Sequence, residues 1–249
     1  MSFLKRARLA QFIARKWFWS LFIYPQSRLT THKLGYDEYW ETKRPKDGVL
    51  SLSPSEQCRA AIIAPRIEKG KVTIGDIGSG PGMVLRSILQ QRPGASGVAF
   101  DSSPRALEYV RTFGIEAELL DITASEAMAR VRPCDYYIAL EVLEHIPNSE
   151  EVLGELLKKS SRGVFFSVPN TGFFTYRLRL LLGKTPAQWI HMPNEHVRFW
   201  TIRDMRWWLS ALGFTPYTIV PYQGVPFFNR IWPNLFAGGM VVFIPSPQH

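Results

Sequence analysis

The residues best suited to chemistry form a glycine-rich turn in the segment VTIGDIGSGPGMV. Gly78, Gly80 and Gly82 follow a short apolar run that contains Asp76 near its end. Because glycine has no Cβ, it permits a tight turn and lets a ligand approach the backbone amides closely. A dinucleotide fingerprint requires G-x-G-x-x-G, whereas position 83 here is Met83. The turn therefore predicts a nucleotide-type ligand, but not the usual dinucleotide motif.

Two more acidic residues follow the next apolar runs. Asp101 comes directly after GVAF, with Ser102 beside it, and Asp121 ends the segment AELLD. A carboxylate at the position of Asp101 can accept hydrogen bonds from both ribose hydroxyls of a nucleotide. Either acid alone could be a helix cap or a turn residue. Three acids at three successive strand ends, counting Asp76, favour a common binding site.

A second cluster lies in the sequence EVLEH, which contains Glu141, Glu144 and His145. If this segment turns helically, positions i, i+3 and i+4 share one face and the three side chains converge. Two carboxylates and an imidazole could hold a divalent cation. Alternatively, Glu141 and His145 border a pocket in which the imidazole, which titrates near neutral pH, removes a proton.

The elements that must position these residues alternate between strand-like and helical patterns. Short apolar strands separated by helices predict βαβ units, a mainly parallel sheet and a ligand at the C-terminal ends of the strands. The last two strands would form an antiparallel pair. The expected strands are Val72–Ile77, Gly97–Phe100, Glu116–Leu120, Tyr136–Leu140, Val164–Val168, Thr215–Val220 and Met240–Ile244. The expected helices are Ser55–Ile67, Met83–Gln91, Pro104–Phe113, Ser125–Arg130, Ser149–Lys159 and Thr201–Leu212.

The glycine turn, with an acidic residue two positions before it, resembles the cofactor motif of class I S-adenosylmethionine-dependent methyltransferases. This resemblance implies a Rossmann-like α/β fold, with a mainly parallel seven-stranded sheet, flanking helices and an antiparallel C-terminal strand pair. It also implies S-adenosylmethionine as the cofactor, with Asp121 at the adenine amino group and Ile122 beside the ring. The implied cofactor-binding residues are Asp76, Gly78, Gly80, Gly82, Asp101, Ser102, Asp121, Ile122 and Glu141.

The EVLEH segment resembles the corresponding stretch of ubiquinone-pathway O-methyltransferases and of small-RNA 2′-O-methyltransferases, in which such residues bind a metal. In the latter, a further histidine comes from a later loop, and here HMPNEHVRFW offers His191 and His196. Many methyltransferases carry the same segment beside the cofactor or acceptor pocket without a known metal. The candidate catalytic residues are His145, Glu141 and His196, and the candidate ligands of a divalent cation such as Mg²⁺ are Glu141, Glu144, His145 and His196.

The composition is that of a globular protein, with 46% hydrophobic and 20% charged residues among 249. Only two cysteines occur, which argues against a disulfide framework or a thiolate metal site and predicts a cytoplasmic setting. Ten basic and three acidic residues lie between Met1 and Lys46, and this segment accounts for most of the net charge of +9. The remaining body is nearly balanced, so a nucleic-acid partner is disfavoured.

We expect a basic, aromatic leader helix at 1–35 and a methyltransferase domain at 36–249. The uncharged run Trp17–Tyr24 has eight residues, too few to span a bilayer, and no cleavage pattern follows it. Residues 1–24 therefore either lie on the inner face of a membrane or pack on the domain. An insertion at about 170–195, rich in aromatic and basic residues, would cover the acceptor or form a surface helix.

The leading functional hypothesis is O-methylation of a small molecule or of a glycan-linked or lipid-linked intermediate. A second hypothesis is RNA 2′-O-methylation with a metal site, which the EVLEH segment and His196 suggest. A third is a non-catalytic subunit, because the chain also resembles methionine-biosynthesis proteins of the MetW type. An intact set of Asp76, Asp101 and Asp121 disfavours the third hypothesis. Fold alone does not decide among them.

Overall fold

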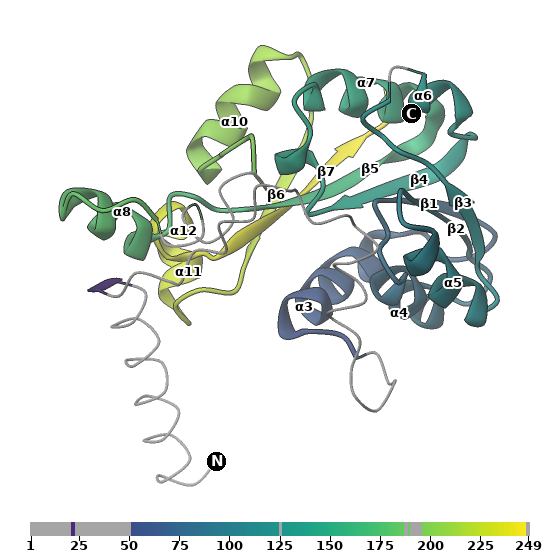
Figure 1. Cartoon of the computed structure of the whole chain (residues 1–249), viewed down its shortest axis with the longest axis horizontal. Coiled ribbons are helices and arrows are strands. Elements are labelled where there is room, and N and C mark those ends of the chain that lie inside the picture. The colour runs from purple at the N-terminus through teal and green to yellow at the C-terminus, as the bar shows by residue number, and fades with distance from the viewer. Residues whose placement is uncertain (1–20, 23–50, 125, 187–188, 190–195, 248–249) are drawn as a thin grey trace, which may run out of the picture.

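The computed structural model describes residues 21–22, 51–124, 126–186, 189 and 196–247. The strands form a seven-stranded sheet with the order β3-β2-β1-β4-β5-β7-β6, in which β7 runs antiparallel to both neighbours and the other pairs are parallel (Figure 1). This arrangement confirms the predicted fold class. The strands are β1 (Thr73–Ile77), β2 (Ser96–Asp101), β3 (Glu116–Leu119), β4 (Cys134–Leu140), β5 (Ser160–Pro169), β6 (Thr218–Tyr222) and β7 (Gly239–Pro245).

The helices between the strands begin at capping residues that the sequence supplies. Ser53 and Thr201 each form a capping box, so both accept a backbone N–H that would otherwise lack a partner. The predicted helix Ser55–Ile67 divides into α3 and η1, because Pro65 has no N–H to continue the α-helical ladder. The helices are α3 (Pro54–Ile63), η1 (Ala64–Arg66), α4 (Met83–Gln91), α5 (Pro104–Thr112), α6 (Ala127–Arg130), η2 (Leu143–His145), α7 (Ser149–Lys159), α8 (Phe174–Leu181), α10 (Ile202–Ala211), α11 (Phe228–Ile231) and α12 (Pro233–Phe236).

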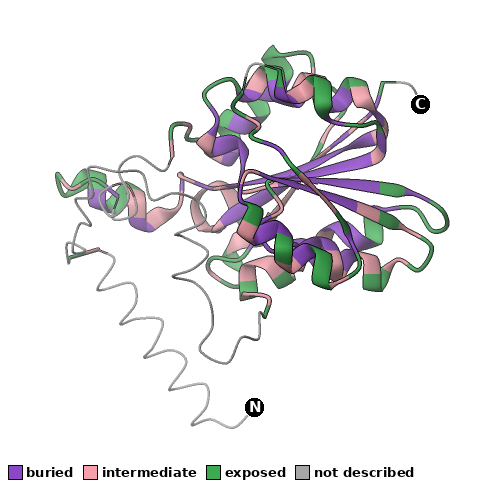
Figure 2. Ribbon diagram, turned by 45° about the vertical axis from the view of Figure 1, so that its right-hand side comes forward, coloured by how far each residue is buried: buried purple, intermediate pink, exposed green. Residues whose placement is uncertain are grey.

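Both faces of the sheet are buried, and each carries its own hydrophobic core (Figure 2). Successive side chains of a strand point to opposite faces, so along β4 Tyr137 and Ala139 join one core while Tyr136 and Ile138 join the other. Helices α6, α7 and α10 contribute to the first core, and α3, α4 and α5 contribute to the second. A sheet covered on both sides explains why its strands read as almost continuous apolar runs.

Parallel pairing brings the C-terminal ends of the central strands to one edge of the sheet. Ile77 of β1 lies in register with Phe100 of β2 and with Ala139 of β4. The glycine turn follows β1, Asp101 ends β2 and Glu141 follows β4, so all three lie at neighbouring strand ends.

The predicted leader at 1–35 lies outside the described residues, apart from Leu21 and Phe22. Among the described residues, no helix has both the length and the apolar character that a membrane crossing requires. The domain boundary at residue 36 also falls outside them and stays a prediction.

Candidate functional site

The glycine turn after β1 requires glycine at each of its three positions. Gly78, Gly80 and Gly82 have φ values of 65°, 52° and 71°, in the left-handed region that other residues avoid. A Cβ on Gly78 would lie 2.6 Å from Val142, and one on Gly82 would lie 2.9 Å from Val110. The turn therefore packs directly against the segment after β4 and against α5, and it brings its backbone to the edge of the sheet.

A Gly78→Ala substitution is expected to lower the free energy of unfolding by about 1–3 kcal/mol more than Gly114→Ala does. Both glycines are left-handed, with φ values of 65° and 70°, but only at Gly78 does the added methyl group meet another side chain. Urea unfolding measures the free energy of unfolding of each variant. Because both variants carry the same kind of backbone strain, the difference between them measures the clash with Val142. Equal losses would show that Val142 yields to the methyl group.

Asp101 fastens this turn to the end of β2. Its Oδ2 accepts the Gly80 N–H at 2.7 Å, and its Oδ1 accepts the Ser103 N–H at 2.8 Å. The side chain is almost completely buried. Ser102, which follows Asp101 in the sequence, is half-buried. Ser103 caps α5, because its Oγ accepts the Ala106 N–H. One carboxylate thus fixes the positions of the glycine turn and of the start of α5.

Asp76 lies buried beside this carboxylate. Burial, and secondly the negative charge of Asp101, raises the pKa of Asp76 well above its usual range, while Arg59 acts in the opposite direction. Arg59 comes from α3 and is itself buried. No sequence pattern indicated a role for Arg59, because an arginine in an expected helix is usually solvated.

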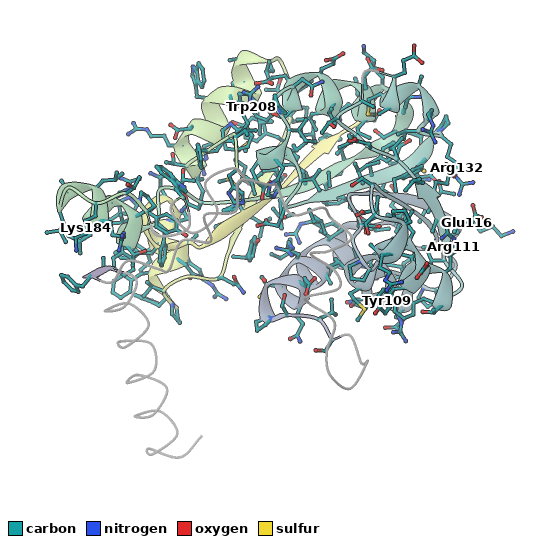
Figure 3. The ribbon with its side chains drawn as sticks, viewed as in Figure 1. Tyr109, Arg111, Glu116, Arg132, Lys184 and Trp208 are labelled. Carbon is teal, nitrogen blue, oxygen red and sulfur yellow. The ribbon has the colours of Figure 1, made fainter. Side chains whose placement is uncertain are left out.

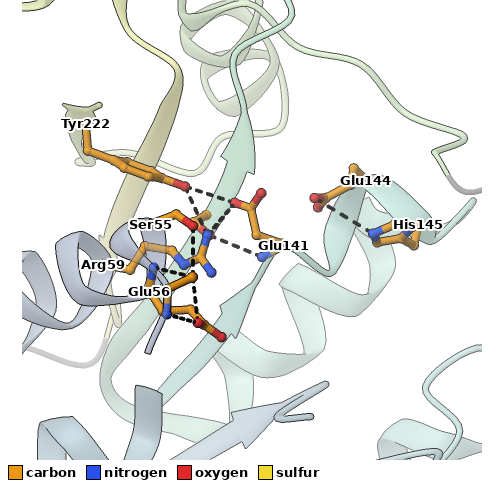
Figure 4. A network of polar contacts seen from close by, with 9 residues as sticks. Ser55, Glu56, Arg59, Glu141, Glu144, His145 and Tyr222 are labelled. Atoms are coloured by element: carbon orange, nitrogen blue, oxygen red, sulfur yellow. Dashed lines mark hydrogen bonds and ion pairs between the residues drawn. The ribbon is translucent and has the colours of Figure 1, made fainter. Parts of the chain in front are cut away.

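The Glu141 carboxylate lies in a polar network that joins four elements (Figure 4). Its Oε1 accepts hydrogen bonds from Ser167 Oγ at 2.8 Å and from Tyr222 Oη at 3.2 Å, and it lies 3.5 Å from Arg59 Nη1. Arg59 also donates to Tyr222 Oη at 3.2 Å. Ser167 belongs to β5 and Tyr222 to β6. The network therefore ties α3 and the C-terminal strands to the end of β4.

The groups in this network shift the pKa values of Arg59 and Tyr222. Burial disfavours the charge of Arg59, but Glu141 and Tyr222 outweigh that penalty and raise its pKa. Burial and the Glu141 carboxylate also raise the pKa of Tyr222, so this residue remains a neutral phenol. Gly239 lies opposite Tyr222 in the β6–β7 pair, and a Cβ there would lie 2.8 Å from the tyrosine ring. The small residue makes room for the ring to reach Glu141.

The prediction that Glu141 converges with Glu144 and His145 is wrong. Glu141 has a left-handed backbone, with φ of 59°, and the helical turn begins only at Leu143. Its side chain consequently points toward Arg59, away from the other two residues (Figure 4). Glu141 thus belongs with Arg59, Ser167 and Tyr222 and not with the two residues that follow it.

Glu144, His145 and His196 do come together. One potential ligand atom from each of the three lies within 4.8 Å of the others. The His145 Nε2 is 3.9 Å from Glu144 Oε1, and the two imidazole rings meet edge to face with centroids 4.6 Å apart. Glu144 is 1% exposed, so its carboxylate faces the protein interior. This arrangement offers one carboxylate and two imidazoles to a single point.

Backbone hydrogen bonds hold His196 beside this pair. The carbonyl of Glu144 accepts the N–H groups of Val197 at 2.9 Å and of Arg198 at 3.0 Å. The Arg198 side chain forms an ion pair with Glu150 of α7 at 2.7 Å. Burial, together with His145, lowers the pKa of His196 to about 4, so this imidazole is neutral near pH 7. His191 lies outside the described residues.

Asp121 and Ile122 follow β3 at the same edge. The Leu120 N–H donates to the Asp101 carbonyl at 2.9 Å, which places the segment beside the end of β2. Asp121 is exposed, and its Oδ1 accepts the N–H of Thr123 at 2.9 Å in a local turn. Ile122 is half-buried against the core. The adenine contact stays a prediction.

Comparison with known families shows to which class of protein this chain belongs. The sequence profile of the methyltransferase domain matches residues 43–219. The chain belongs to this methyltransferase domain family. The matched segment contains the glycine turn, Asp101, the Glu144–His145–His196 cluster and the Glu141 network apart from Tyr222. A search of curated proteins returned no match.

Solved structures of methyltransferases share the fold at low sequence identity. A chain of the complex between the Haloferax volcanii Trm112 methyltransferase activator and a methyltransferase is 13% identical, with a TM-score of 0.60, over 87% of this chain and 100% of that one. An S-adenosylmethionine-dependent methyltransferase of Thermotoga maritima is 12% identical, with a TM-score of 0.55, over 77% and 89%. The magnesium protoporphyrin IX methyltransferase of Synechocystis PCC 6803, with bound S-adenosylhomocysteine, is 13% identical, with a TM-score of 0.56, over 84% and 96%. These similarities establish a class I methyltransferase fold.

Proposed function

We propose that this methyltransferase uses S-adenosylmethionine to methylate an oxygen of a small molecule or of a glycan-linked or lipid-linked intermediate. The observation that carries the proposal is the glycine turn, which is exposed at Gly78, has no room for a Cβ there and is fixed by Asp101 at the buried Gly80. A buried guanidinium nitrogen, Arg59 Nε, has no hydrogen-bond partner among the described residues. A buried donor of this kind fits a ligand with a carboxylate, such as the methionine part of the cofactor.

The residues around the turn would each hold one part of the cofactor. Asp101 would accept the ribose hydroxyls, as an acid at this strand end does in other nucleotide-binding α/β folds. Asp121 would contact the adenine, and Asp76 would face the cationic ammonium group, whose charge would lower the pKa of that buried acid. Arg59 would bind the carboxylate. The bound cofactor supplies an electrophilic methyl group that needs little activation by the protein.

The acceptor side would align the hydroxyl group and remove its proton. His145 lies at the same edge as the glycine turn, and we assign to it the role of general base, with Glu144 holding the imidazole in place. Aromatic rings from the insertion and the following loop lie next to the cluster, because the Phe199 ring is 6.5 Å from that of His196 and packs at a tilt against Trp189, with centroids 4.5 Å apart. Such a lining suits an acceptor with an apolar part.

Titration calorimetry with S-adenosylhomocysteine, followed by a transfer assay with labelled S-adenosylmethionine, tests this proposal. The expected result is binding of one molecule per chain and transfer to an acceptor oxygen. Absence of cofactor binding in the folded protein would refute it. Binding without transfer to any acceptor tested would favour the non-catalytic, MetW-like role. Salt-sensitive RNA binding with transfer to a ribose would favour the 2′-O-methyltransferase.

A second candidate role for the cluster is a divalent-cation site. Two imidazoles and one carboxylate are a donor set that suits Zn²⁺, whereas Mg²⁺ prefers oxygen ligands alone. Because Glu141 contacts Tyr222 and does not lie in the cluster, one of the two expected oxygen ligands is missing. The geometry therefore favours a transition metal over the expected Mg²⁺.

Metal titration of two glutamate variants tests the site. Glu144→Gln is expected to lower the affinity for Zn²⁺ at least about tenfold, because it removes a ligand, whereas Glu141→Gln leaves that affinity within about twofold. Calorimetry with Zn²⁺ on the chelator-treated protein measures both, and circular dichroism checks that each variant folds. If the wild type shows no Zn²⁺ binding, the cluster acts without a metal, and His145 retains the role of base.

A further inference from the structure

Large apolar side chains are exposed at the end of the molecule formed by α8, α11 and α12. Leu181 is 83% exposed, Ile231 is 64% exposed and Trp232 is 59% exposed. Side chains of this size usually reach the core, and a cluster of them on one surface marks a contact site. We call this surface the α8–α12 face. It consists of Leu180, Leu181, Phe227, Phe228, Ile231 and Trp232.

The elements that carry this face pack on one another (Figure 1). The Phe236 ring of α12 contacts Phe174 of α8, Phe228 of α11 and Trp232, with centroids 5.8, 5.4 and 6.3 Å apart. The buried Asn170, just after β5, donates to the carbonyl of Ala237 at 2.8 Å. This hydrogen bond connects the residue after α12 to the residue after β5, so the face adjoins the sheet.

The backbone before α11 adopts a strained conformation that presents an aromatic side chain. Phe227 has φ of 70°, which is rare for an aromatic residue, and its side chain is 69% exposed. Gly224, with φ of 88°, precedes it, and a Cβ there would lie 1.9 Å from the Phe236 carbonyl oxygen. This turn holds Phe227 outward although burial of the ring would be favourable.

The elements that carry the face contain basic side chains and no acidic ones. The segments 170–186 and 205–249 contain no aspartate or glutamate. Arg177 lies in α8, Lys184 follows α8, and Arg230 lies in α11. A surface of leucine and aromatic side chains, on elements that carry basic and no acidic residues, complements an anionic bilayer, in which Trp and Phe enter the headgroup region.

The described part of the leader joins the same surface. Arg179 Nη1 donates to the Leu21 carbonyl at 3.2 Å, and Lys184 Nζ donates to the Phe22 carbonyl at 3.3 Å. Phe22 is itself exposed. These contacts place Leu21 and Phe22 next to α8.

We infer that the α8–α12 face docks this protein on the surface of an anionic membrane. The face is distinct from the cofactor residues, so the inference does not depend on the methyl-transfer chemistry. Because α8 begins shortly after β5 ends, a docked bilayer would lie at the acceptor edge of the sheet. A lipid-linked acceptor could then reach the site without leaving the membrane.

Vesicle flotation of the full chain tests this inference. The expected result is binding to phosphatidylcholine vesicles that contain about 30% phosphatidylglycerol, weak binding to phosphatidylcholine alone, and loss of binding as salt rises to about 0.5 M. A Leu181→Ser, Ile231→Ser, Trp232→Ser variant is expected to lose at least about tenfold in partitioning. Leu119→Ser is the matched control, since Leu119 is 50% exposed on the edge strand β3.

A charge-reversal pair tests the electrostatic contribution. Arg230→Glu is expected to weaken vesicle binding several-fold, whereas Arg111→Glu, at the end of the molecule opposite Lys184, leaves it unchanged (Figure 3). Binding of S-adenosylhomocysteine by every variant shows that the domain is folded. Unchanged partitioning of the triple variant would overturn the inference and assign any membrane contact to residues 1–24. A change from dimer to monomer in the triple variant, with unaltered vesicle binding, would also overturn it.

Discussion

An Asp101→Asn variant is expected to bind S-adenosylmethionine about 100-fold more weakly than the wild-type protein, because hydrogen bonds to a charged group contribute about 1.5–3 kcal/mol each. The carboxylate accepts the N–H groups of Gly80 and Ser103. An amide can accept only one of them and turns its NH₂ group toward the other. The variant would lose both the fixed shape of the glycine turn and the acceptor proposed for the ribose.

Calorimetry with S-adenosylhomocysteine measures this loss, and Asp135→Asn is the matched control. Asp135 also accepts a backbone N–H, from Thr73 at 2.7 Å, but it lies near the N-terminal ends of β1 and β4. We expect that variant to lose stability and to keep its cofactor affinity. A similar loss of affinity in both variants would indicate a general effect on the sheet and would contradict the role of Asp101.

A His145→Ala variant is expected to lower kcat about 100- to 10,000-fold, while the affinity for the cofactor stays within about twofold. The reason is that the imidazole is the proposed acceptor of the proton from the substrate hydroxyl. Partial rescue by added imidazole, and loss of the acidic limb of the pH–rate profile, would identify a base. A merely structural role would produce neither effect.

His196→Ala provides the comparison for this result. If His145 is the base and no metal is bound, removing His196 would lower kcat far less than removing His145. If both variants lose activity to the same degree and both lose Zn²⁺, the cluster is a metal site. A His145→Ala enzyme that retains more than about a tenth of its kcat would exclude both roles.

The glycine turn and its position at the sheet edge could be predicted because their signals are local. Glycines at alternate positions after an apolar run require a left-handed turn, and the structure gives Gly78, Gly80 and Gly82 that conformation. The alternation of strands and helices then places the C-terminal ends of the parallel strands at one edge of the sheet. Asp101 could be placed beside the turn for the same reason, since both follow parallel strands.

The acceptor side could be predicted only in part. The sequence EVLEH suggests one continuous helical turn, but a single left-handed residue, Glu141, separates its side chain from Glu144 and His145. A φ of 59° at a glutamate has no signature in the residue types around it. Arg59 and Tyr222 were missed for another reason: they are 163 positions apart, so only the folded structure shows that they contact the same carboxylate.

The separation of Arg59 and Tyr222 along the chain also determines when the site becomes complete during synthesis. A ribosome produces α3 and the glycine turn early, but Tyr222 emerges only with β6, near the end of the chain. Until then, Arg59 and Glu141 lack their shared phenol and the nascent site is unfinished. If Arg59 binds the cofactor as proposed, a truncated translation product would contain every residue of the glycine motif and still hold the cofactor poorly, so ligand binding would distinguish finished chains from unfinished ones.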